Sequence, residues 1–418
     1  MKVRFQFVMS CVALAYAALL TGCHSMPTHH DSRESLETFY FEDLPPVEGT
    51  DLKLGGFSGL VFEGYSKLHG EYDFTTLTDR GPNEDARKEG TRKEAGNSNL
   101  RPFVAPNFSP RFVQFSFDPI KKKVGAVDEI PMKRFDGSPM TGLPNIFGLD
   151  ETPIDKIGHR LALDKLGVDT EGLAKDPADG SYWACEEYRP SILHFDKNAK
   201  LLQRWIPKDT ATGTGVPQLP KWYVKRVPNR GFEGIAVDGE RVVAFLQSPL
   251  EGDYDVTRVL AVEKSTGRPA AEYVYAFETK EEGRSPADKI GDAVTIGNGR
   301  YLVVEQNGFS DERGVHRIYE IDVNDATDLL SRKGAPLSAH SLCLEGVATK
   351  SCVKPVKKKL VADLVALGLH GFDKIEGLAV IDSQTLALVN DNDFDVSKSG
   401  SPSAFFIVHL AEPLKLSY

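Results

Sequence analysis

One short segment recurs three times along the chain and decides its predicted fold. The copies are Glu171-Gly172-Leu173-Ala174, Glu233-Gly234-Ile235-Ala236 and Glu376-Gly377-Leu378-Ala379, and Ser58-Gly59-Leu60 and Asp292-Ala293-Val294 are variants of them. Each full copy begins with an acidic residue, continues with glycine and ends in apolar residues. Such recurrence at intervals of tens of residues indicates a repeat architecture.

Further strand-like runs follow each copy. Second runs cover residues 74–79, 182–187, 241–247, 301–305 and 385–391, and third runs cover 111–117, 191–195, 257–262, 317–321 and 404–410. Fourth runs follow in some repeats, at 201–206 and 271–277. Four short strands in a repeat of about sixty residues predict an all-β fold, a single β-propeller. A β-sandwich, or two separate β domains, is the alternative.

The spacing of the copies predicts five or six blades, because the first interval is long enough to contain a degenerate blade. Helical periodicity is confined to residues 359–369. Propellers close by pairing strands from the two ends of the domain, and residues 37–55 and 413–418 are the candidates. The expected organisation is a signal peptide (1–22), a flexible tether (23–36) and the propeller domain (37–418).

Composition narrows the classes of function. The 418 residues are 41% hydrophobic, which favours a folded core over disorder. Fifty basic and 60 acidic residues give a net charge of −10, which argues against a general nucleic-acid binder. After the N-terminal segment no run of about 18 apolar residues occurs, so no transmembrane helix is expected there.

The N-terminus resembles that of a bacterial lipoprotein. Lys2 and Arg4 precede an apolar stretch at about 8–20, which ends in Leu20-Thr21-Gly22-Cys23. This resemblance implies cleavage before Cys23, lipidation of its thiol and anchoring of the exported protein to a membrane. His24, rather than aspartate, follows the cysteine, and in bacteria with two membranes this implies the outer one. An ordinary signal peptide or an uncleaved anchor is the alternative.

Three cysteines remain in the expected mature chain. Cys343 and Cys352 lie close together in one irregular stretch and are expected to form a disulfide, which export permits. Cys185 lies in an apolar run and is expected to be a buried core residue rather than a nucleophile.

Acidic residues are expected to converge in a propeller of this sequence. The first strand of each blade lines the central channel, which would bring Glu171, Glu233, Asp292 and Glu376 into a ring with Ser58. Like charges so arranged raise one another's pKa unless a cation or basic group intervenes. A second set lies at the polar ends of the second strands: Asp79, Glu186, Gln247, Glu305 and Asp391, near Arg80 and Arg189. The alternative for any one carboxylate is a structural role, accepting backbone N–H groups.

Several motifs in order resemble the bacterial family named for the esterase-like activity of phytase. They are Gly56-Phe57-Ser58-Gly59-Leu60, Leu77-Thr78-Asp79-Arg80-Gly81, Thr141-Gly142-Leu143-Pro144, Glu151-Thr152-Pro153, Asp169-Thr170-Glu171-Gly172-Leu173-Ala174, Gly231-Phe232-Glu233-Gly234 and Asn390-Asp391-Asn392-Asp393-Phe394. The resemblance covers about residues 50–410 and implies a phytase-like propeller whose acids support phosphoester hydrolysis. The related β-propeller phytases use calcium held by carboxylates.

The leading hypothesis is therefore a calcium-dependent phosphoric-ester hydrolase. Asp79 or Glu186 would act as general base, and Arg80 and Arg189 would hold the phosphate. The expected metal ligands are Glu171, Glu233, Asp292, Glu376 and Asp391, with Glu233 also taking part in catalysis. No Gly-x-Ser-x-Gly motif occurs, which disfavours a serine esterase. A non-catalytic envelope protein that binds a ligand or protein partner, or a purely structural metal site, is the alternative.

Overall fold

The fold is a five-bladed β-propeller. The computed structural model describes residues 34–418 except 89–98, 211–213, 279–282, 344–351 and 399. The expected signal peptide, and Cys23 with it, lies outside these described residues. Within them no helix is long and apolar enough to cross a membrane.

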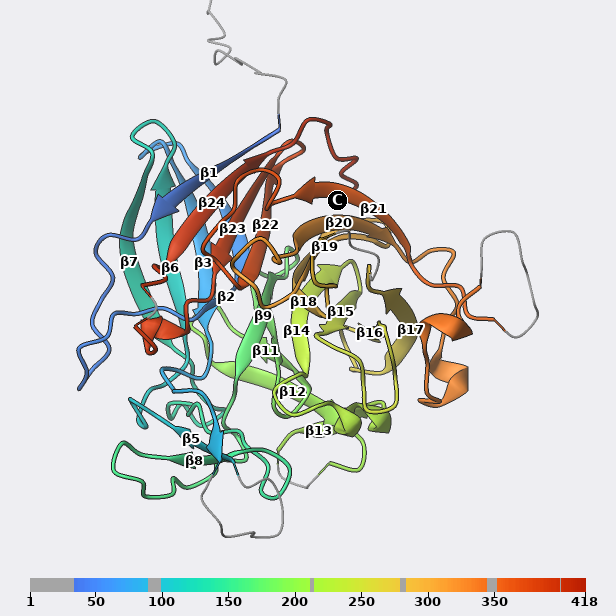
Figure 1. Ribbon diagram of the computed structural model, residues 1–418, viewed down its shortest axis with the longest axis horizontal. Helices are drawn as coiled ribbons and strands as arrows, with labels where there is room; N and C mark the ends of the chain where they lie inside the picture. The colour runs from blue at the N-terminus through green and yellow to red at the C-terminus, as the bar shows by residue number, and fades with distance from the viewer. Residues whose placement is uncertain (1–33, 89–98, 211–213, 279–282, 344–351, 399) are drawn as a thin grey trace, which may run out of the picture. The chain divides into compact units, whose positions relative to one another are not determined.

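Five antiparallel sheets of consecutive strands form the blades (Figure 1). The first consists of β2 (Phe57–Ser66), β3 (Glu71–Thr78), β6 (Arg111–Asp118) and β7 (Lys123–Pro131). The second consists of β9 (Thr170–Lys175), β10 (Tyr182–Glu186), β11 (Ser191–Phe195) and β12 (Leu201–Pro207), with β13 (Val216–Leu219) added in parallel. The third consists of β14 (Phe232–Asp238), β15 (Arg241–Leu246), β16 (Val256–Glu263) and β17 (Pro269–Ala276).

The fourth and fifth blades complete the ring. The fourth consists of β18 (Lys289–Gly297), β19 (Arg300–Gln306), β20 (His316–Asp322) and β21 (Lys357–Asp363). The fifth consists of β22 (Ile375–Asp382), β23 (Thr385–Asn390), β24 (Ala404–His409) and β1 (Ser35–Tyr40). The first strands contact one another in the cyclic order β2, β9, β14, β18, β22 and back to β2. The propeller prediction is therefore confirmed, with five blades rather than six.

Closure depends on the N-terminal strand. β1 pairs antiparallel with β24 from Ser35 opposite His409 to Tyr40 opposite Ala404, so the blue and red ends of the domain share one sheet (Figure 1). β1 thus begins two residues before the predicted domain start. The second expected closing segment, residues 413–418, forms no strand.

Two other expectations need correction. In the described part of the long first interval, the strands form not a sixth blade but a small sheet of β4 (Arg87–Lys88), β5 (Asn99–Pro102) and β8 (Thr152–Ile154). Residues 359–369, where the spacing indicated a helix, form the end of β21 and a turn, because pairing with β20 overrides the local pattern. The described helices are short 3-10 turns: η1 (Lys221–Lys225), η2 (Leu330–Arg332), η3 (Ala339–Ser341) and η4 (Asp393–Asp395).

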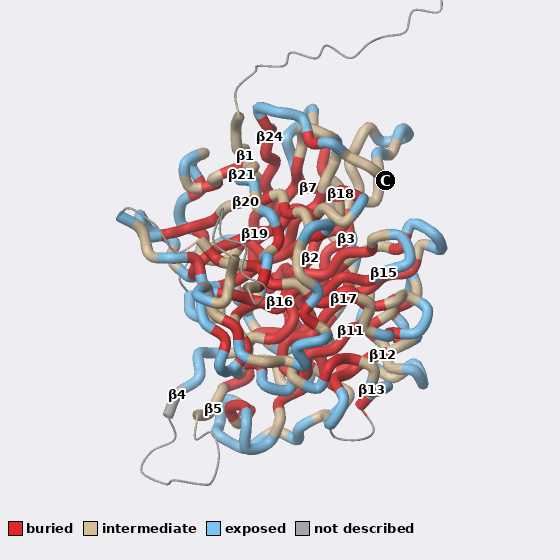
Figure 2. Tube along the Cα trace, turned by 90° about the vertical axis from the view of Figure 1, so that its right-hand side faces the viewer, coloured by how far each residue is buried: buried red, intermediate tan, exposed pale blue. Residues whose placement is uncertain are grey.

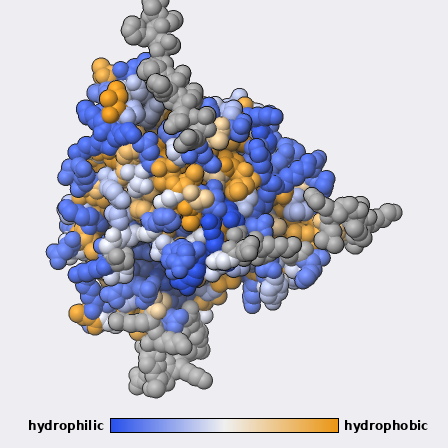
Figure 3. Space-filling view, turned by 45° about the horizontal axis from the view of Figure 1, so that its top comes forward, coloured by the Kyte–Doolittle hydropathy of each residue, from blue (hydrophilic) through white to orange (hydrophobic). Residues whose placement is uncertain are grey.

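The apolar core lies between the blades, where the strands are buried and the connecting loops are exposed (Figure 2). In β15, Val242 and Ala244 pack toward the second blade, whereas Val243 and Phe245 pack toward the fourth. Successive side chains of a strand point to opposite faces, so a strand packed between two neighbouring blades is favoured to be apolar on both faces. This explains the continuous apolar runs seen in the sequence. On the face drawn in Figure 3, hydrophilic side chains surround a smaller group of hydrophobic ones.

The recurrent glycines allow neighbouring first strands to approach closely. A Cβ on Gly59 would lie 2.4 Å from the backbone N of Leu173, one on Gly172 2.7 Å from that of Ile235, and one on Gly234 2.8 Å from that of Ala293. Each glycine therefore faces the next blade, where backbone leaves no room for a side chain. Cys343 and Cys352 are joined by a disulfide bond, and Cys185 is buried with a free thiol.

We expect Gly234→Ala to lower the free energy of unfolding by about 1–3 kcal/mol, because the new methyl group overlaps the backbone of the next blade. Chemical denaturation measures this change. Gly308→Ala is the matched control, since its Cβ would meet only Lys289 Nζ, at 3.8 Å. Equal stability of the two variants would contradict the close packing of blades.

Candidate functional site

Side chains from all five blades line a cavity of about 730 Å³. Most of its lining residues lie on the first strands of the blades or close beyond the strand ends, and Arg101 comes from the inserted strand β5. The charged and amide groups used below are Asp79, Arg80, Asp169, Glu171, Glu187, Arg230, Glu233, Gln247, Lys289, Lys374, Glu376, Asp391 and Asp393. Because every blade contributes, the cavity lies where the first strands converge.

A β-bulge places the acidic residue of each glutamate repeat. Phe232 pairs with Leu246 and Gly234 with Phe245, so Glu233 is an extra residue in β14. Glu376 is likewise extra between Ile375 and Gly377 in β22, and the pairing of β9 shifts across Glu171. A bulge re-aims the side chain of the bulged residue. Both the repeat and its irregularity therefore direct a carboxylate toward the cavity.

Glu171, Glu233 and Glu376 form a cluster that we call the glutamate triad. One carboxylate oxygen from each lies within 4.8 Å of the others, and the residues are only 6%, 1% and 5% exposed. Glu233 accepts a hydrogen bond from Gln247 Nε2 at 2.6 Å. Glu171 has no hydrogen-bond or ion-pair partner among the described residues. The triad thus concentrates acidic oxygens that no basic side chain of the described chain contacts.

Burial and repulsion together disfavour ionisation of these carboxyl groups. Burial, then the neighbouring carboxylates, raises the pKa of Glu171 and Glu233 well above the ordinary value. Glu187, which with Asp169 forms a second close group around Glu171, has its pKa raised by burial and Asp169 to about 8. A bound cation would remove both the repulsion and the desolvation penalty.

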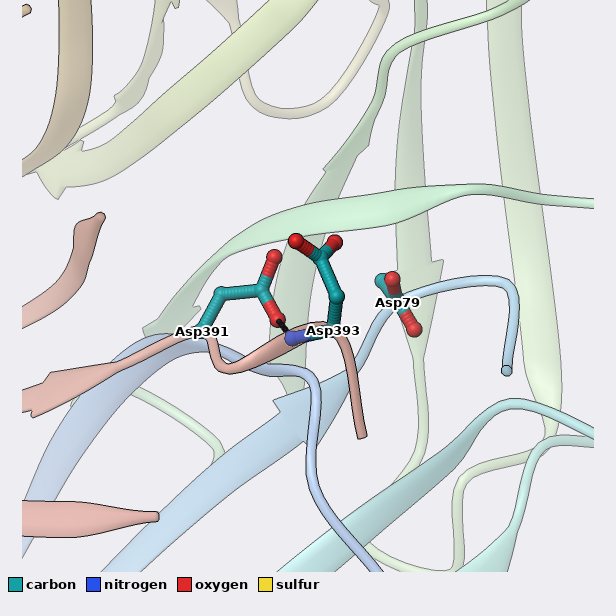
Figure 4. Close-up of side chains that lie close together, drawn as sticks. All are labelled: Asp79, Asp391 and Asp393. Atoms are coloured by element: carbon teal, nitrogen blue, oxygen red, sulfur yellow. Dashed lines mark hydrogen bonds between the residues drawn. The ribbon is translucent and has the colours of Figure 1, made fainter. Parts of the chain in front are cut away.

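A second acidic cluster differs because it contains its own cation. Asp391 and Asp393 follow β23 and Asp79 follows β3, with carboxylate oxygens within 4.8 Å of one another (Figure 4). Lys374 Nζ lies 2.7 Å from Asp391 Oδ2 and 2.6 Å from Asp393 Oδ1. Burial and neighbouring carboxylates, Asp391 first, raise the pKa of Asp79 well above its usual range.

Basic side chains line the same cavity. Lys289 is 7% exposed, and no carboxylate in the described part of the chain lies within ion-pair distance of it. Arg230 Nη1 donates to Gln247 Oε1 at 2.7 Å. These two cations, opposed to the glutamate triad in charge, make the cavity suited to an anion and a metal cation together.

Arg80 is held in place rather than free. Its guanidinium lies 4.8 Å from the ring centroid of Phe103 and 4.3 Å from that of Tyr188, and Nη2 is 3.0 Å from Glu151 Oε1. Its backbone N–H donates to Asp169 Oδ1 at 2.9 Å. Arg80 therefore positions Asp169 instead of presenting an unpaired charge to a ligand.

The structure places Glu186, Arg189 and Asp292 outside this cavity, contrary to the sequence interpretation. Glu186 accepts the backbone N–H groups of Asp169, Tyr188 and Arg189, which gives its carboxylate structural partners. Asp292 accepts those of Ala293 and Leu378 and joins the fourth blade to the fifth.

Arg189 and Glu305 also have structural partners. Arg189 Nε donates to the Pro144 carbonyl at 2.6 Å and Nη2 to that of Asn145 at 2.9 Å. Glu305 accepts hydrogen bonds from the Tyr275 hydroxyl and the Lys358 ammonium. Asp79, Arg80, Glu171, Glu233, Gln247, Glu376 and Asp391 do line the cavity.

Six of the cavity residues used above were not assigned a role from the sequence: Asp169, Glu187, Arg230, Lys289, Lys374 and Asp393. Asp169 lies two residues before Glu171, a spacing that puts both side chains on one side of a strand and could have revealed it. Glu187 is adjacent to Glu186, and spacing alone did not show which of the two faces the cavity. No sequence signal marked the two lysines.

Without metal ions, we expect the melting temperature to fall as pH rises from about 5 to about 8. A carboxyl group with a raised pKa in the folded state binds more protons folded than unfolded, so stability falls with pH between the two pKa values. Glu171→Gln should flatten this slope and raise the melting temperature at pH ~8 by roughly 2 °C or more. Calorimetry in chelator measures both effects. Glu84 lines the same cavity but is exposed, so Glu84→Gln is the control. If the melting temperature of E171Q fell with pH as steeply as that of the parent, repulsion within the glutamate triad would be contradicted.

Comparisons with known proteins give one family and distant structural neighbours. An uncharacterized secreted protein from Arthroderma benhamiae is 24% identical over 164 residues, 31% of this chain and 32% of that one. This chain thus spans about a third of the length of that relative.

Solved structures that align include the PQQ-bound aldose sugar dehydrogenase from Streptomyces coelicolor, 12% identical, covering 91% of this chain and 99% of that one, with a TM-score of 0.34. Another is the α-L-arabinofuranosidase from Podospora anserina, 7% identical, covering 91% and 98%, with a TM-score of 0.40. Neither alignment informs the chemistry of the cavity. The family described as esterase-like activity of phytase matches residues 52–394, and the chain belongs to this phytase-like family.

Proposed function

We propose that the protein is a divalent-cation-dependent phosphoric-ester hydrolase whose active site is the cavity lined by all five blades. The glutamate triad is the observation that carries the proposal. Its three buried carboxylates come from three blades, and no basic side chain among the described residues forms an ion pair with them. Hard oxygen donors of this kind suit calcium, the cation that the family resemblance implies.

The donor set fits such a cation. Glu171, Glu233 and Glu376 would hold it, with Asp169 and Glu187 close to Glu171 as further oxygen donors. The Asp79–Asp391–Asp393 cluster is the weaker candidate, because Lys374 already neutralises part of its charge. When bound, calcium would neutralise phosphate charge and lower the pKa of a water molecule.

The chain's own residues would bind the substrate and move a proton. Lys289 and Arg230 offer the positive charge that a phosphate group needs. Asp79 lines the same cavity beside other carboxylates, so it is the candidate general base. Arg80 acts as a positioning residue through Asp169.

Localisation is part of the proposal. Cleavage before Cys23 and lipidation of its thiol would tether the exported propeller to the cell envelope, at the outer membrane in a host with two membranes. β1 begins twelve residues after Cys23, so a short linker would separate the lipid from the domain.

We expect the purified mature chain to release phosphate from phytate, or the chromophore from a chromogenic phosphodiester, with calcium and not with excess chelator. Glu171→Gln, Glu233→Gln and Glu376→Gln should each lower kcat/KM at least about a hundredfold, because each removes a charged cation ligand. Glu84→Gln is the matched control and should retain activity.

Lys289→Met should raise KM more than it lowers kcat if Lys289 binds substrate equally in the ground and transition states.

The outcomes separate an enzyme from a binding protein. No calcium-dependent turnover on either substrate, together with a calcium-dependent rise in melting temperature, would favour the non-catalytic alternative. Full activity in chelator, or in the triad variants, would contradict the proposal itself.

A further inference from the structure

A second cavity lies apart from the first and shares no lining residue with it. It measures about 220 Å³. Its walls are mainly apolar, among them Leu149, Ile206, Pro207 and Val224, and two arginines, Arg189 and Arg226, also line it. An apolar cavity with a few polar groups is the usual form of a small-molecule site.

Arg189 is a buried cation without a counter-ion. It is 7% exposed, and no carboxylate in the described regions lies within ion-pair distance of its guanidinium. Nε and Nη2 donate to the carbonyls of Pro144 and Asn145, which fixes the orientation of the plane but neutralises no charge. Nη1 has no partner in the described part of the chain. A buried, uncompensated charge is unfavourable, so an anion at this place would be stabilising.

Arg226 also lines the cavity, but its guanidinium nitrogens are already engaged or covered by protein. Its Nη2 lies 2.8 and 2.9 Å from the two carboxylate oxygens of Asp150, and Nε donates to the Tyr188 carbonyl at 2.6 Å. Nη1 is buried and unpartnered among the described residues. Asp150 neutralises Arg226, and the remaining acid of the cavity, Asp209, lies 3.8 Å from Lys221. One net positive charge, that of Arg189, is therefore left.

We propose that this second cavity binds a small organic carboxylate with an apolar body, held by Arg189. The guanidinium nitrogens match a carboxylate in charge and geometry, and the apolar walls would take its hydrocarbon part. At ~30 Å³ per water-sized unit the volume holds roughly seven non-hydrogen atoms, close to the eight of a six-carbon acid such as hexanoate. The proposal does not depend on the function of the first cavity.

The test titrates hexanoate into the full mature chain by isothermal calorimetry, with hexanamide as the neutral ligand of the same shape. We expect saturable binding of one hexanoate, and binding of hexanamide at least tenfold weaker. Equal affinity for the two ligands would overturn the role of the charge. Competition by inorganic phosphate at equal concentration would overturn the requirement for an apolar body, and absence of saturable binding up to ~10 mM would overturn the site.

Two kinds of variant locate the site. Arg189→Gln should weaken hexanoate binding at least tenfold, but it also removes hydrogen bonds to the Pro144–Asn145 backbone. Val224→Glu avoids this problem, because Val224 is 41% exposed and the substitution places a negative charge at the cavity. Its control is Val227→Glu, which is 44% exposed and does not line the cavity. We expect at least tenfold loss in V224E and less than twofold in V227E, and equal losses would contradict the assignment.

Discussion

The close approach of the first strands is the constraint on which the rest of the structure depends. At Gly59, Gly172 and Gly234 the backbone of the next blade occupies the space that a Cβ would need. The ring can therefore close tightly only where these positions lack a side chain. The residue before glycine is the carboxylate in the second, third and fifth blades, and it lies in a bulge that turns it toward the cavity. Packing and site geometry thus have one origin.

This geometry brings buried carboxylates close together, and the blades differ in how they compensate the negative charge. The carboxylate of Asp292 accepts hydrogen bonds from backbone N–H groups of two blades. The carboxylate of Asp391 accepts a hydrogen bond from the ammonium group of Lys374. Among the described residues, the carboxylate of Glu171 has neither backbone N–H donors nor a basic partner. Its pKa is raised by burial and by four neighbouring acids. A site that concentrates unpaired carboxylates lowers stability unless a ligand compensates them, which is the physical case for a cation.

Much of the fold could be predicted from the sequence because the propeller repeats its signal. The second and third runs of each repeat coincide with strands such as β10, β11, β15 and β16. The three repeat glutamates line one cavity, whereas Asp292 does not. The number of blades could not be fixed from the sequence, because the insertion that contains β5 and β8 lengthens the first interval without adding a blade. The helix expected at 359–369 failed because sheet pairing outweighs local periodicity.

The site was only partly predictable, for a reason visible at Glu186 and Glu187. Adjacent residues of a strand face opposite sides, so a one-residue difference separates a cavity carboxylate from one buried among backbone donors. The sequence spacing did not resolve that difference. Lys289 comes from the start of β18, where neither repeat nor motif distinguishes it from any other strand residue.

The most direct measurement is anomalous X-ray scattering from crystals of the mature chain grown with calcium or with manganese in its place. Our account predicts one ordered ion within about 2.6 Å of carboxylate oxygens from Glu171, Glu233 and Glu376 together. An ion bound elsewhere while these three side chains remain unligated, or three glutamates that do not converge, would contradict it.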